Sequence, residues 1–588
     1  MKNKLSYLAI VFLTLTALSC ADELGKIAPK NVPTFDALSG EVGISALAKG
    51  GVYLNGFGGT YGSIDDGLGT GFQLLVYGMH EAMGDVIYVP WGNNDFKYLN
   101  NPTDIKFDDA SISIMPIASV SPVGQPSEVR LRNSRSYGAT NSILVEWTYM
   151  YIMNNAMNVI LENVDKTAFS GDAATKKATM KAWAHFWKGY AYSRIGSMYI
   201  SGLIIDKSYV TNGTYVTNTA IIAEAKNQFE QAKTLLGGIT NTGDYNGLLS
   251  TIMPAYCLQN GIPTPAAFIR NCNTMEARNI LVNKKIPGTI GPMAAMTATD
   301  WNDVKTLTAG GSGIGASDGV FVIKTTSNPS TSVIDPFFGA VGPYAATNDP
   351  TFFISEKLVQ DIRQGDRRFD QNFALLSSPQ VNRRGRGYNY GTRWYLVDDG
   401  TGAFPSTYTY SHTDVFGVDS HFMGASWEEN QLMQAESLIQ TGSIVAGTAI
   451  IDAVRTSQGA NLGAIVAGTV ALAMEELRSE RRVALLFRSL AFYDARRRGI
   501  INDKAVGGGR GPGGALDVPG WDHEKNVATT GAVIMHPTIG TLTTGTGTTK
   551  ININAFINYN FLNYWDIPKN ELEYNAPTAG SSVIISPN

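Results

Sequence analysis

Residues 427–458, WEENQLMQAESLIQTGSIVAGTAIIDAVRTSQ, contain the pattern that predicts the fold of this chain. Two segments with helical periodicity, 427–440 and 443–458, are separated by a turn at Gly442. Small side chains let two helices approach closely, as they do in tetratricopeptide-like helix pairs. The small residues of this stretch that fall at helical spacing are Ala435, Ala446, Ala449 and Ala453.

Helical periodicity recurs along the rest of the chain and predicts a mainly α fold. Residues 173–200 show it clearly, with apolar side chains at three- and four-residue steps from Met180 to Met198. The intervals between helix pairs are too uneven for an array of roughly 34-residue repeats, which indicates a helical scaffold with large insertions. Further helices are expected over 74–83, 143–163, 221–236, 268–283 and 469–498, with a glycine-interrupted helix over 40–59 and a strand over 320–325.

The start of the chain has the features of an exported lipoprotein. A short basic region is followed by the uncharged apolar run 5–18, which is shorter than the ~20 residues of a membrane-spanning helix. The run ends in Ala17-Leu18-Ser19-Cys20, where small residues precede a thiol that can receive a diacylglycerol. We therefore expect residues 1–19 to be a signal peptide and Cys20 to be the lipid attachment site. An ordinary signal peptide with an incidental cysteine is the alternative.

The net charge bears on which partners the protein can bind, and the cysteine content bears on its disulfide bonds. The 588 residues carry a formal charge of −4, and the mature chain, without Lys2 and Lys4, has 44 basic and 50 acidic residues, or −6. Nucleic acid would call for a basic face, so it is not expected as a partner. Besides Cys20 the chain contains Cys257 and Cys272, which can pair in an oxidising compartment or remain as two buried thiols.

The sequence contains no motif that is typical of a catalytic site or a metal site. Residues 310–315, GGSGIG, lack the Gly-Lys-Ser/Thr ending of a phosphate-binding loop, so a plain loop is expected over 310–319. Asp65-Asp66 offers carboxylates, but no pattern selects a glycosidase pair. We expect no catalytic residue, no cofactor and no metal site, and a structural calcium ion is not indicated. None of the six histidines has zinc-protease spacing: His80, His185, His412, His421, His523 and His536.

Aromatic and amide side chains gather in the expected loop 85–101 and suit a sugar ligand. Sugar rings have apolar C–H faces that lie on Trp and Tyr, and their hydroxyls need amide or carboxylate partners. A packed loop with buried aromatics is the alternative. The ligand-binding candidates are Tyr88, Trp91, Asn93, Asn94, Asp95, Phe96 and Tyr98.

A second candidate is the expected loop 382–396, which is basic as well as aromatic. Its character suits acidic glycans or peptide carboxylates, and a lid or scaffold role is the alternative. Trp301, by contrast, is expected in the core. The residues of this second stretch are Arg383, Arg384, Arg386, Tyr388, Tyr390, Arg393, Trp394 and Tyr395, of which Arg386, Tyr388 and Trp394 are the secondary ligand-binding candidates.

Between about 140 and 575 the chain carries a series of short motifs, among them Gly365-Asp366-Arg367-Arg368, Glu480-Arg481 and residues 565–575. This series resembles the SusD/RagB family of outer-membrane nutrient-binding lipoproteins. Their order along the chain carries the resemblance, although Asp452, Ala484, Arg488 and Ser489 depart from the family's usual residues. We expect Glu480, Arg481, Asp494 and Arg497 to form structural ion pairs between scaffold helices. The motifs are Glu428-Glu429 with Leu432, Ala435-Glu436 with Gly442, residues 451–455, Glu480-Arg481, residues 494–497, Gly365-Asp366-Arg367-Arg368 and residues 565–575.

The resemblance implies a fold, a role and a location. The fold would be mainly α, with about four tetratricopeptide-like helix pairs, long irregular loops and a few short strands. After an acylated tether, 20–40, one SusD-like binding domain would span 41–588, with halves at about 41–290 and 291–588. Such a lipoprotein captures oligosaccharides or peptides at the cell outer membrane and delivers them to a SusC-like TonB-dependent transporter. A surface glycan-processing enzyme or a structural lipoprotein is the alternative.

Overall fold

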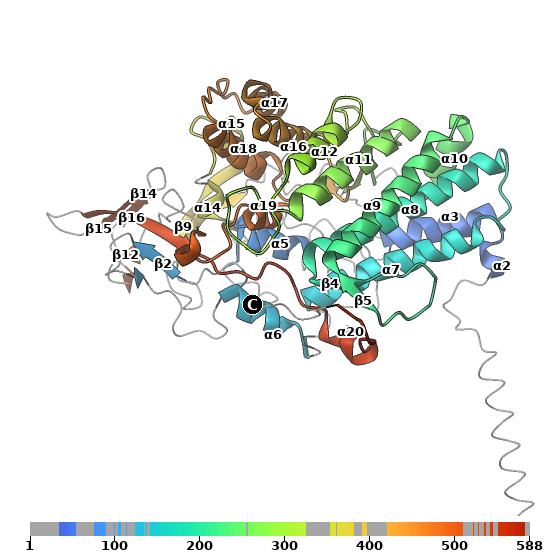
Figure 1. Ribbon diagram of the computed structural model, residues 1–588. Coiled ribbons are helices and arrows are strands. Elements are labelled where there is room, and N and C mark those ends of the chain that lie inside the picture. The colour runs from blue at the N-terminus through green and yellow to red at the C-terminus, as the bar shows by residue number, and fades with distance from the viewer. Residues whose placement is uncertain are drawn as a thin grey trace, which may run out of the picture.

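The structure is a computed structural model, and its helices and strands separate in space (Figure 1). Helices fill one side of the molecule, and most strands lie at the opposite end. The residues that it describes are 35–54, 76–89, 99, 104–107, 113–114, 124–134, 136–137, 141–253, 257–324, 353–359, 361–381, 391–396, 420–509, 521–522, 527–528, 534–536, 541–544 and 551–582.

Long helices of the N-terminal half pack side by side, as Figure 1 shows for α7 to α11. Polar caps begin several of them: the Asp172 carboxylate accepts from the backbone N–H groups of Ala174 and Thr175. Thr264 caps a helix that has proline at its first position. These helices confirm the expected periodic segments within a few residues and add two short helices. Their bounds are α3 Glu41–Lys49, α7 Ser142–Asn163, α8 Ala173–Met198, α9 Asn218–Gly237, α10 Thr242–Ile252, α11 Pro265–Val282 and α12 Ala298–Thr308.

The stretch 427–458 forms the expected helix pair, α16 Trp427–Gln440 and α17 Ile444–Ser457. The close approach, however, rests on Gly447. A Cβ atom at that position would lie 2.5 Å from Ile439 Cγ1 and 2.8 Å from the Ala435 carbonyl oxygen. Ala435 is buried in this contact. The expectation that three alanines of α17 also allow the close approach is wrong, because Ala446, Ala449 and Ala453 face solvent.

The single helix expected over 469–498 is divided into α18 Val470–Ala484 and α19 Ala491–Arg497. Phe487 and Ser489 have positive φ angles of 56° and 59°, which no helix accommodates. Contacts with other parts of the fold hold this break. The backbone N–H of Ser489 donates to the Glu81 carboxyl group at 2.6 Å, and Arg488 pairs with Glu428 at 2.8 Å.

The smaller helices connect the scaffold to the strand-rich end. Gly50–Leu54 continues α3 as a π-helix, so the expected glycine-interrupted segment is confirmed as far as residue 54. The remaining helices are α2 Phe35–Leu38, α5 Gly78–Met83, α6 Gly124–Arg132, α14 Glu356–Val359, α15 Arg367–Asn372, the 3₁₀ turn Lys504–Val506 and α20 Lys569–Tyr574.

Short strands form several small antiparallel sheets. One sheet has the order β1-β8-β10-β9, formed by Ile87–Tyr88, Phe353–Ile354, Gly391–Leu396 and Phe373–Val381. The expectation of a continuous loop over 382–396 is therefore wrong for 391–396, because residues 391–396 pair with both β8 and β9. The other strands are β2 Asp104–Phe107, β3 Ser113–Ile114, β4 Ser201–Leu203, β5 Tyr215–Thr217, β6 Leu258–Gln259, β7 Val320–Lys324, β11 Ser420–Phe422, β12 Trp521–Asp522, β13 Val527–Ala528, β14 Ile534–His536, β15 Thr541–Thr544 and β16 Ile551–Asn558.

The main core is aromatic where α8 meets β7. Trp183, Phe186 and Trp187 surround Phe321, with the Phe186 and Phe321 ring centroids 4.8 Å apart. Trp301 is 4% exposed, which confirms its expected place in the core. Cys257 and Cys272 are buried free thiols, so the alternative without a disulfide applies.

Buried ion pairs join the C-terminal helices, as the sequence indicates. The Asp494 carboxylate binds Arg481 at 2.7 Å and Arg497 at 2.9 Å. Although burial favours the neutral acid, these guanidinium groups hold the pKa of Asp494 well below its usual range. Arg497 also pairs with Glu436 of α16. The signature residues are therefore structural.

The segment 559–582 closes the fold over the N-terminal helices. Trp565 is fully buried, and its backbone bonds to Met198 and Ile200 at 2.7 and 2.9 Å. Its indole packs edge-on against the rings of His80 and Tyr199. Figure 1 shows α20, which follows, beneath β4 and β5. Within the described residues, no helix combines the length and apolar character needed to cross a membrane.

Candidate ligand-binding site

The sheet β1-β8-β10-β9 joins the two stretches that the sequence analysis selects. Ile87 lies opposite Ile354, and Trp394 lies opposite both Ile354 and Leu375. Since β1 and β10 each run antiparallel to β8, they run in the same direction. The end of β1 at Tyr88 therefore lies toward the Leu396 end of β10.

One face of this sheet is a small aromatic cluster. Tyr88 packs against Phe353 with ring centroids 6.5 Å apart, and Leu376 and Tyr395 complete the contact. Tyr88 is only 1% exposed. Tyr88 therefore matches the alternative of a packed, buried aromatic residue. Its ring is enclosed by this cluster, so the structure does not support Tyr88 as a ligand-binding residue.

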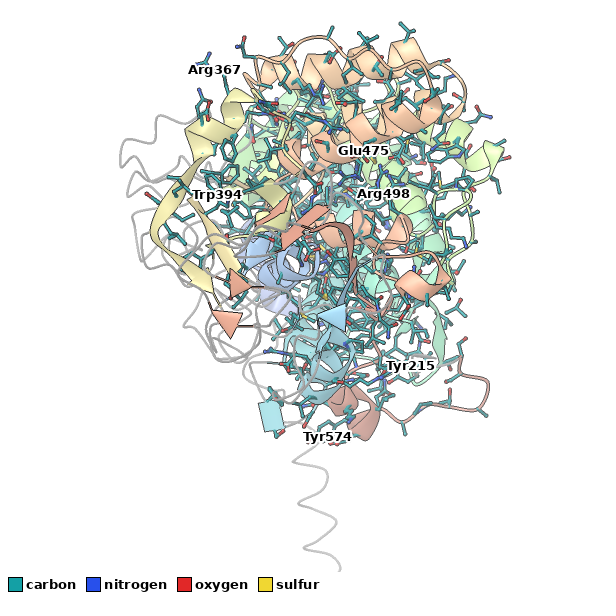
Figure 2. All side chains as sticks on the ribbon, turned by 90° about the vertical axis from the view of Figure 1, so that its left-hand side faces the viewer. Tyr215, Arg367, Trp394, Glu475, Arg498 and Tyr574 are labelled. Atoms are coloured by element: carbon teal, nitrogen blue, oxygen red, sulfur yellow. The ribbon has the colours of Figure 1, made fainter. Side chains whose placement is uncertain are left out.

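Trp394 points to the other face, toward α15. Its ring meets Phe369 edge-on with centroids 4.9 Å apart, and Trp394 itself is half-buried. The adjacent Leu375, on the edge strand β9, is 60% exposed. Figure 2 labels Trp394 on the strands at the side facing the viewer. Trp394 and Leu375 thus form a partly exposed apolar surface at the edge of the sheet.

A backbone irregularity sets the direction of Trp394. The β9–β10 register shifts between Thr392 and Trp394, and such a bulge re-aims the side chain that follows it. The Thr392 hydroxyl donates to the Ile354 carbonyl at 2.5 Å and accepts from the Trp394 backbone N–H at 3.1 Å. The buried threonine therefore fixes the bulge and the tryptophan beside it.

The platform beneath Trp394 is rigid because α15 is tied to α18. Arg368, next to Phe369, binds Glu480 at 2.6 Å and Asp366 at 2.7 Å, and all three side chains are buried. Asp366 also caps α15 by accepting from the Arg368 backbone N–H. The acidic partners raise the pKa of Arg368 against the effect of its burial, so its guanidinium group remains charged.

Several sequence candidates lie outside the described residues, so their predicted roles stay predictions. Backbone alone is described for Arg393. The candidates concerned are Cys20, Trp91, Asn93, Asn94, Asp95, Phe96, Tyr98, Arg383, Arg384, Arg386, Tyr388 and Tyr390.

The fold matches solved structures along nearly the whole chain. A crystal structure with a xylogluco-oligosaccharide is matched over 93% of this chain and 99% of that one, with 12% identity and a TM-score of 0.51. A second solved structure gives the same coverage and identity with a TM-score of 0.54. A SusD-like carbohydrate binding protein from Bacteroides vulgatus is matched over 94% of this chain and 100% of that one, with 14% identity and a TM-score of 0.49. The two matches with TM-scores above 0.5 show that this chain shares their fold. No protein-family model and no curated protein matches the sequence.

The helical scaffold also contains a pocket of about 440 Å³ between α9, α11 and α12, which the sequence analysis missed. Ile222, Ile280 and Leu307 provide apolar walls. Glu276 lines the pocket and binds Lys233 at 2.8 Å. Burial raises the pKa of Glu276 to about 7, although Lys233 acts in the opposite direction. Three helices distant in sequence build this pocket, so no local motif could have indicated it.

Among the residues that the structure describes, no three His, Cys, Asp or Glu side chains are grouped as metal ligands. The aromatic edge around Trp394 can offer a flat apolar surface to a ligand.

Proposed function

We propose that this SusD-like protein is a surface lipoprotein of the outer membrane that binds oligosaccharides and delivers them to a SusC-like TonB-dependent transporter. The observation that carries the binding role is the half-buried Trp394 beside exposed Leu375, on a sheet edge braced by buried ion pairs. A fixed aromatic ring offers the C–H face of a sugar a flat surface without losing freedom on binding.

Glycan as the ligand is supported by the solved structures that share the fold. One of them was crystallised with a xylogluco-oligosaccharide, and others are described as carbohydrate binding proteins. Peptide remains the second ligand class, since the basic residues of 382–396 suit carboxylates. The anchor at Cys20, the surface location and the transporter partner rest on the leader pattern and on the family resemblance.

The test is calorimetry of residues 21–588 against a panel of neutral and acidic oligosaccharides and peptides. We expect saturable binding without product formation. Trp394→Ala should weaken it about tenfold, which corresponds to the loss of one aromatic contact. Trp394→Phe should retain most of the affinity. Trp91→Ala tests the primary sequence candidate in the same assay.

A matched control is Leu472→Ala, which removes an exposed apolar side chain from α18, away from the sheet. It should bind like the unchanged protein. If no member of the panel binds, the proposed role as an independent binding protein is wrong. If binding survives Trp394→Ala but not Trp91→Ala, the function stands and the site lies in the 88–98 stretch.

Two further measurements test the location and the alternative activity. Mass spectrometry of the protein from its native membrane should find acyl chains on Cys20, and co-purification should recover a large transporter. Hydrolysis of any glycan of the panel would instead favour the enzyme alternative. The pocket that contains Glu276 would then be the first place to substitute, by Glu276→Gln.

A further inference from the structure

The turn between β4 and β5, residues 204–214, is hydrogen-bonded to the helices α7 and α8. We call this segment the 204–214 turn. Its Ile205 carbonyl accepts hydrogen bonds from Asn154 and Asn158 of α7, at 2.9 and 3.0 Å. Lys188 of α8 reaches the same carbonyl at 3.5 Å. The three side chains are buried, so these bonds are shielded from water.

Tyr192 of α8 adds a two-way bond to the same residue. Its hydroxyl donates to the Ile205 carbonyl and accepts from the Ile205 backbone N–H, both at 2.9 Å. One backbone position thus has contacts from four buried polar side chains on two helices. Because each helix is itself packed in the core, the 204–214 turn is held to a rigid base.

Further bonds fix the tip of the turn. The backbone N–H and hydroxyl of Ser208 donate to the Glu162 carboxylate at 2.9 and 2.6 Å. The backbone N–H of Tyr209 donates to the Asn155 side chain at 2.8 Å. Asn212 closes the turn internally through the Ile204 carbonyl, also at 2.8 Å.

What these bonds hold in place is an exposed ring. Tyr209 has a φ of 53°, a conformation that is costly for a bulky side chain, and its side chain is 58% exposed. Val210 beside it is exposed as well. Within the described residues, the Tyr209 side chain makes no hydrogen bond or ring contact that would offset this strain. Strained, over-determined backbone of this kind is found at ligand contacts.

The C-terminal segment adds a second exposed ring next to the same turn. Asn575 donates to the Asn212 carbonyl at 2.9 Å, and the Thr578 backbone N–H donates to the Gly213 carbonyl at 2.9 Å. Tyr574, next to Asn575, is 75% exposed. Figure 2 shows Tyr574 near Tyr215, the first residue of β5 after the turn, and both lie away from Trp394.

We propose that the 204–214 turn is a second glycan-binding subsite, with the Tyr209 ring as its stacking surface. This inference rests on the proposed function and extends it to a surface that is separate from Trp394. Asp206 and Lys207, both exposed on the same turn, supply an acceptor and a donor for sugar hydroxyls.

The pattern of exposed groups favours a sugar over a protein partner. A protein-binding patch is a contiguous apolar area of several hundred Å². Here the apolar side chains Tyr209 and Val210 are directly flanked by charged and polar residues. Exposed rings bordered by hydrogen-bonding groups match the alternation of apolar faces and hydroxyls on a sugar. A long glycan that contacts both subsites would gain avidity through effective concentration.

The experiment compares Tyr209→Asn with the unchanged protein, residues 21–588, in calorimetry against whichever glycan of the panel binds. Asparagine accepts a positive φ, so this variant removes the ring without straining the turn. We expect one binding site fewer for short oligosaccharides, and about tenfold weaker binding of the corresponding polysaccharide. Tyr209→Phe, which keeps the ring, should bind like the unchanged protein.

Controls separate this inference from the proposed function. Leu472→Ala removes a side chain of equal exposure, 58%, and should change nothing. If the unchanged protein binds no glycan, the proposed function fails. If glycan binding is normal and survives Tyr209→Asn with unaltered stoichiometry, only the second subsite is wrong. Loss of nutrient uptake by cells carrying Tyr209→Asn, with normal glycan binding in solution, would also overturn it and assign the turn to a protein contact.

Discussion

Arg368 and Glu480 form a buried two-point ion pair, with Nη1–Oε1 and Nη2–Oε2 distances of 2.6 and 2.9 Å. The two residues are 112 positions apart and belong to α15 and α18. Arg455 of α17 binds the same carboxylate at 3.0 Å. Three helices thus meet at one acidic side chain, directly behind the Phe369–Trp394 contact of the candidate site.

Loss of this carboxylate should loosen both the fold and the site. Glu480→Gln leaves the Arg368 and Arg455 guanidinium groups buried without their full counter-charge, so we expect the free energy of unfolding to fall by about 3–5 kcal/mol. Chemical denaturation measures it. Glu475→Gln, on the exposed side of the same helix, should cost less than about 1 kcal/mol. Equal effects of the two substitutions would contradict the role of the buried pair.

Helix packing around Gly447 gives a second prediction. Gly447→Ala should destabilise the protein by about 1–3 kcal/mol, because its methyl group would overlap Ile439 and the Ala435 carbonyl. Gly247→Ala in α10 is the matched control, since nothing lies within 4 Å of the added Cβ. It should stabilise the protein by up to about 1 kcal/mol through helix propensity alone. Thermal unfolding of both variants measures these changes in stability. Stabilisation by Gly447→Ala would refute the close contact.

The strained tyrosine gives a prediction on stability that is independent of any ligand. Tyr209→Asn should raise the free energy of unfolding by up to about 1 kcal/mol, because asparagine tolerates the left-handed region better than a bulky aromatic residue. Denaturant titration without glycan measures it, with Tyr209→Phe as the control that should leave stability unchanged. A marked loss of stability in Tyr209→Asn would mean that the ring packs against the protein after all.

Stability should also depend on pH through Glu81. Burial raises the pKa of Glu81 to about 8, against the effects of Ser489 and Arg482. Between pH 4.5, its ordinary value, and about 8, the folded protein holds a proton that the unfolded chain has released. This group therefore makes stability fall as pH rises through that window, by up to about 1.4 kcal/mol per pH unit.

Glu81→Gln removes this titration, so its stability relative to the unchanged protein should increase from pH 5 to pH 8. Urea unfolding at several pH values within the window measures the difference. Glu475→Gln, an exposed carboxylate, is the control and should leave the slope as it was. Parallel pH profiles for Glu81→Gln and the unchanged protein would show that the Glu81 carboxyl is not protonated in the fold.

Sequence reasoning recovered the elements whose information is local. The apolar periodicity of α8 and the caps and breakers around α16 and α17 lie within the segments themselves. The break after Ala484 was missed, because it is imposed by Glu81 from about 400 positions away. The strand β10 was also missed, since its pairing partners β8 and β9 are separate segments that a periodicity analysis does not connect.

In the candidate sites, too, some features are encoded locally in the sequence and others are set by tertiary contacts. The basic and aromatic residues around Trp394 make it a candidate in the sequence, and its role stays a prediction. The aromatic and amide residues of 88–98 make Tyr88 a candidate too, but its ring is buried. Tyr209 was missed altogether. Its exposure and positive φ depend on Asn155 and Glu162, whose spacing on α7 has no distinctive pattern. Side-chain type can be read from the sequence, but the direction in which a ring points is set by tertiary contacts.

The position of Trp565 has a consequence for biosynthesis. This residue covers His80 and Tyr199, and its backbone pairs with the end of α8. A chain that emerges from its N-terminus leaves that surface open to other apolar segments until residue 565 has been made. Folding of the N-terminal helices can therefore become complete only after that residue has been synthesised, and chains that stop before it are expected to be aggregation-prone.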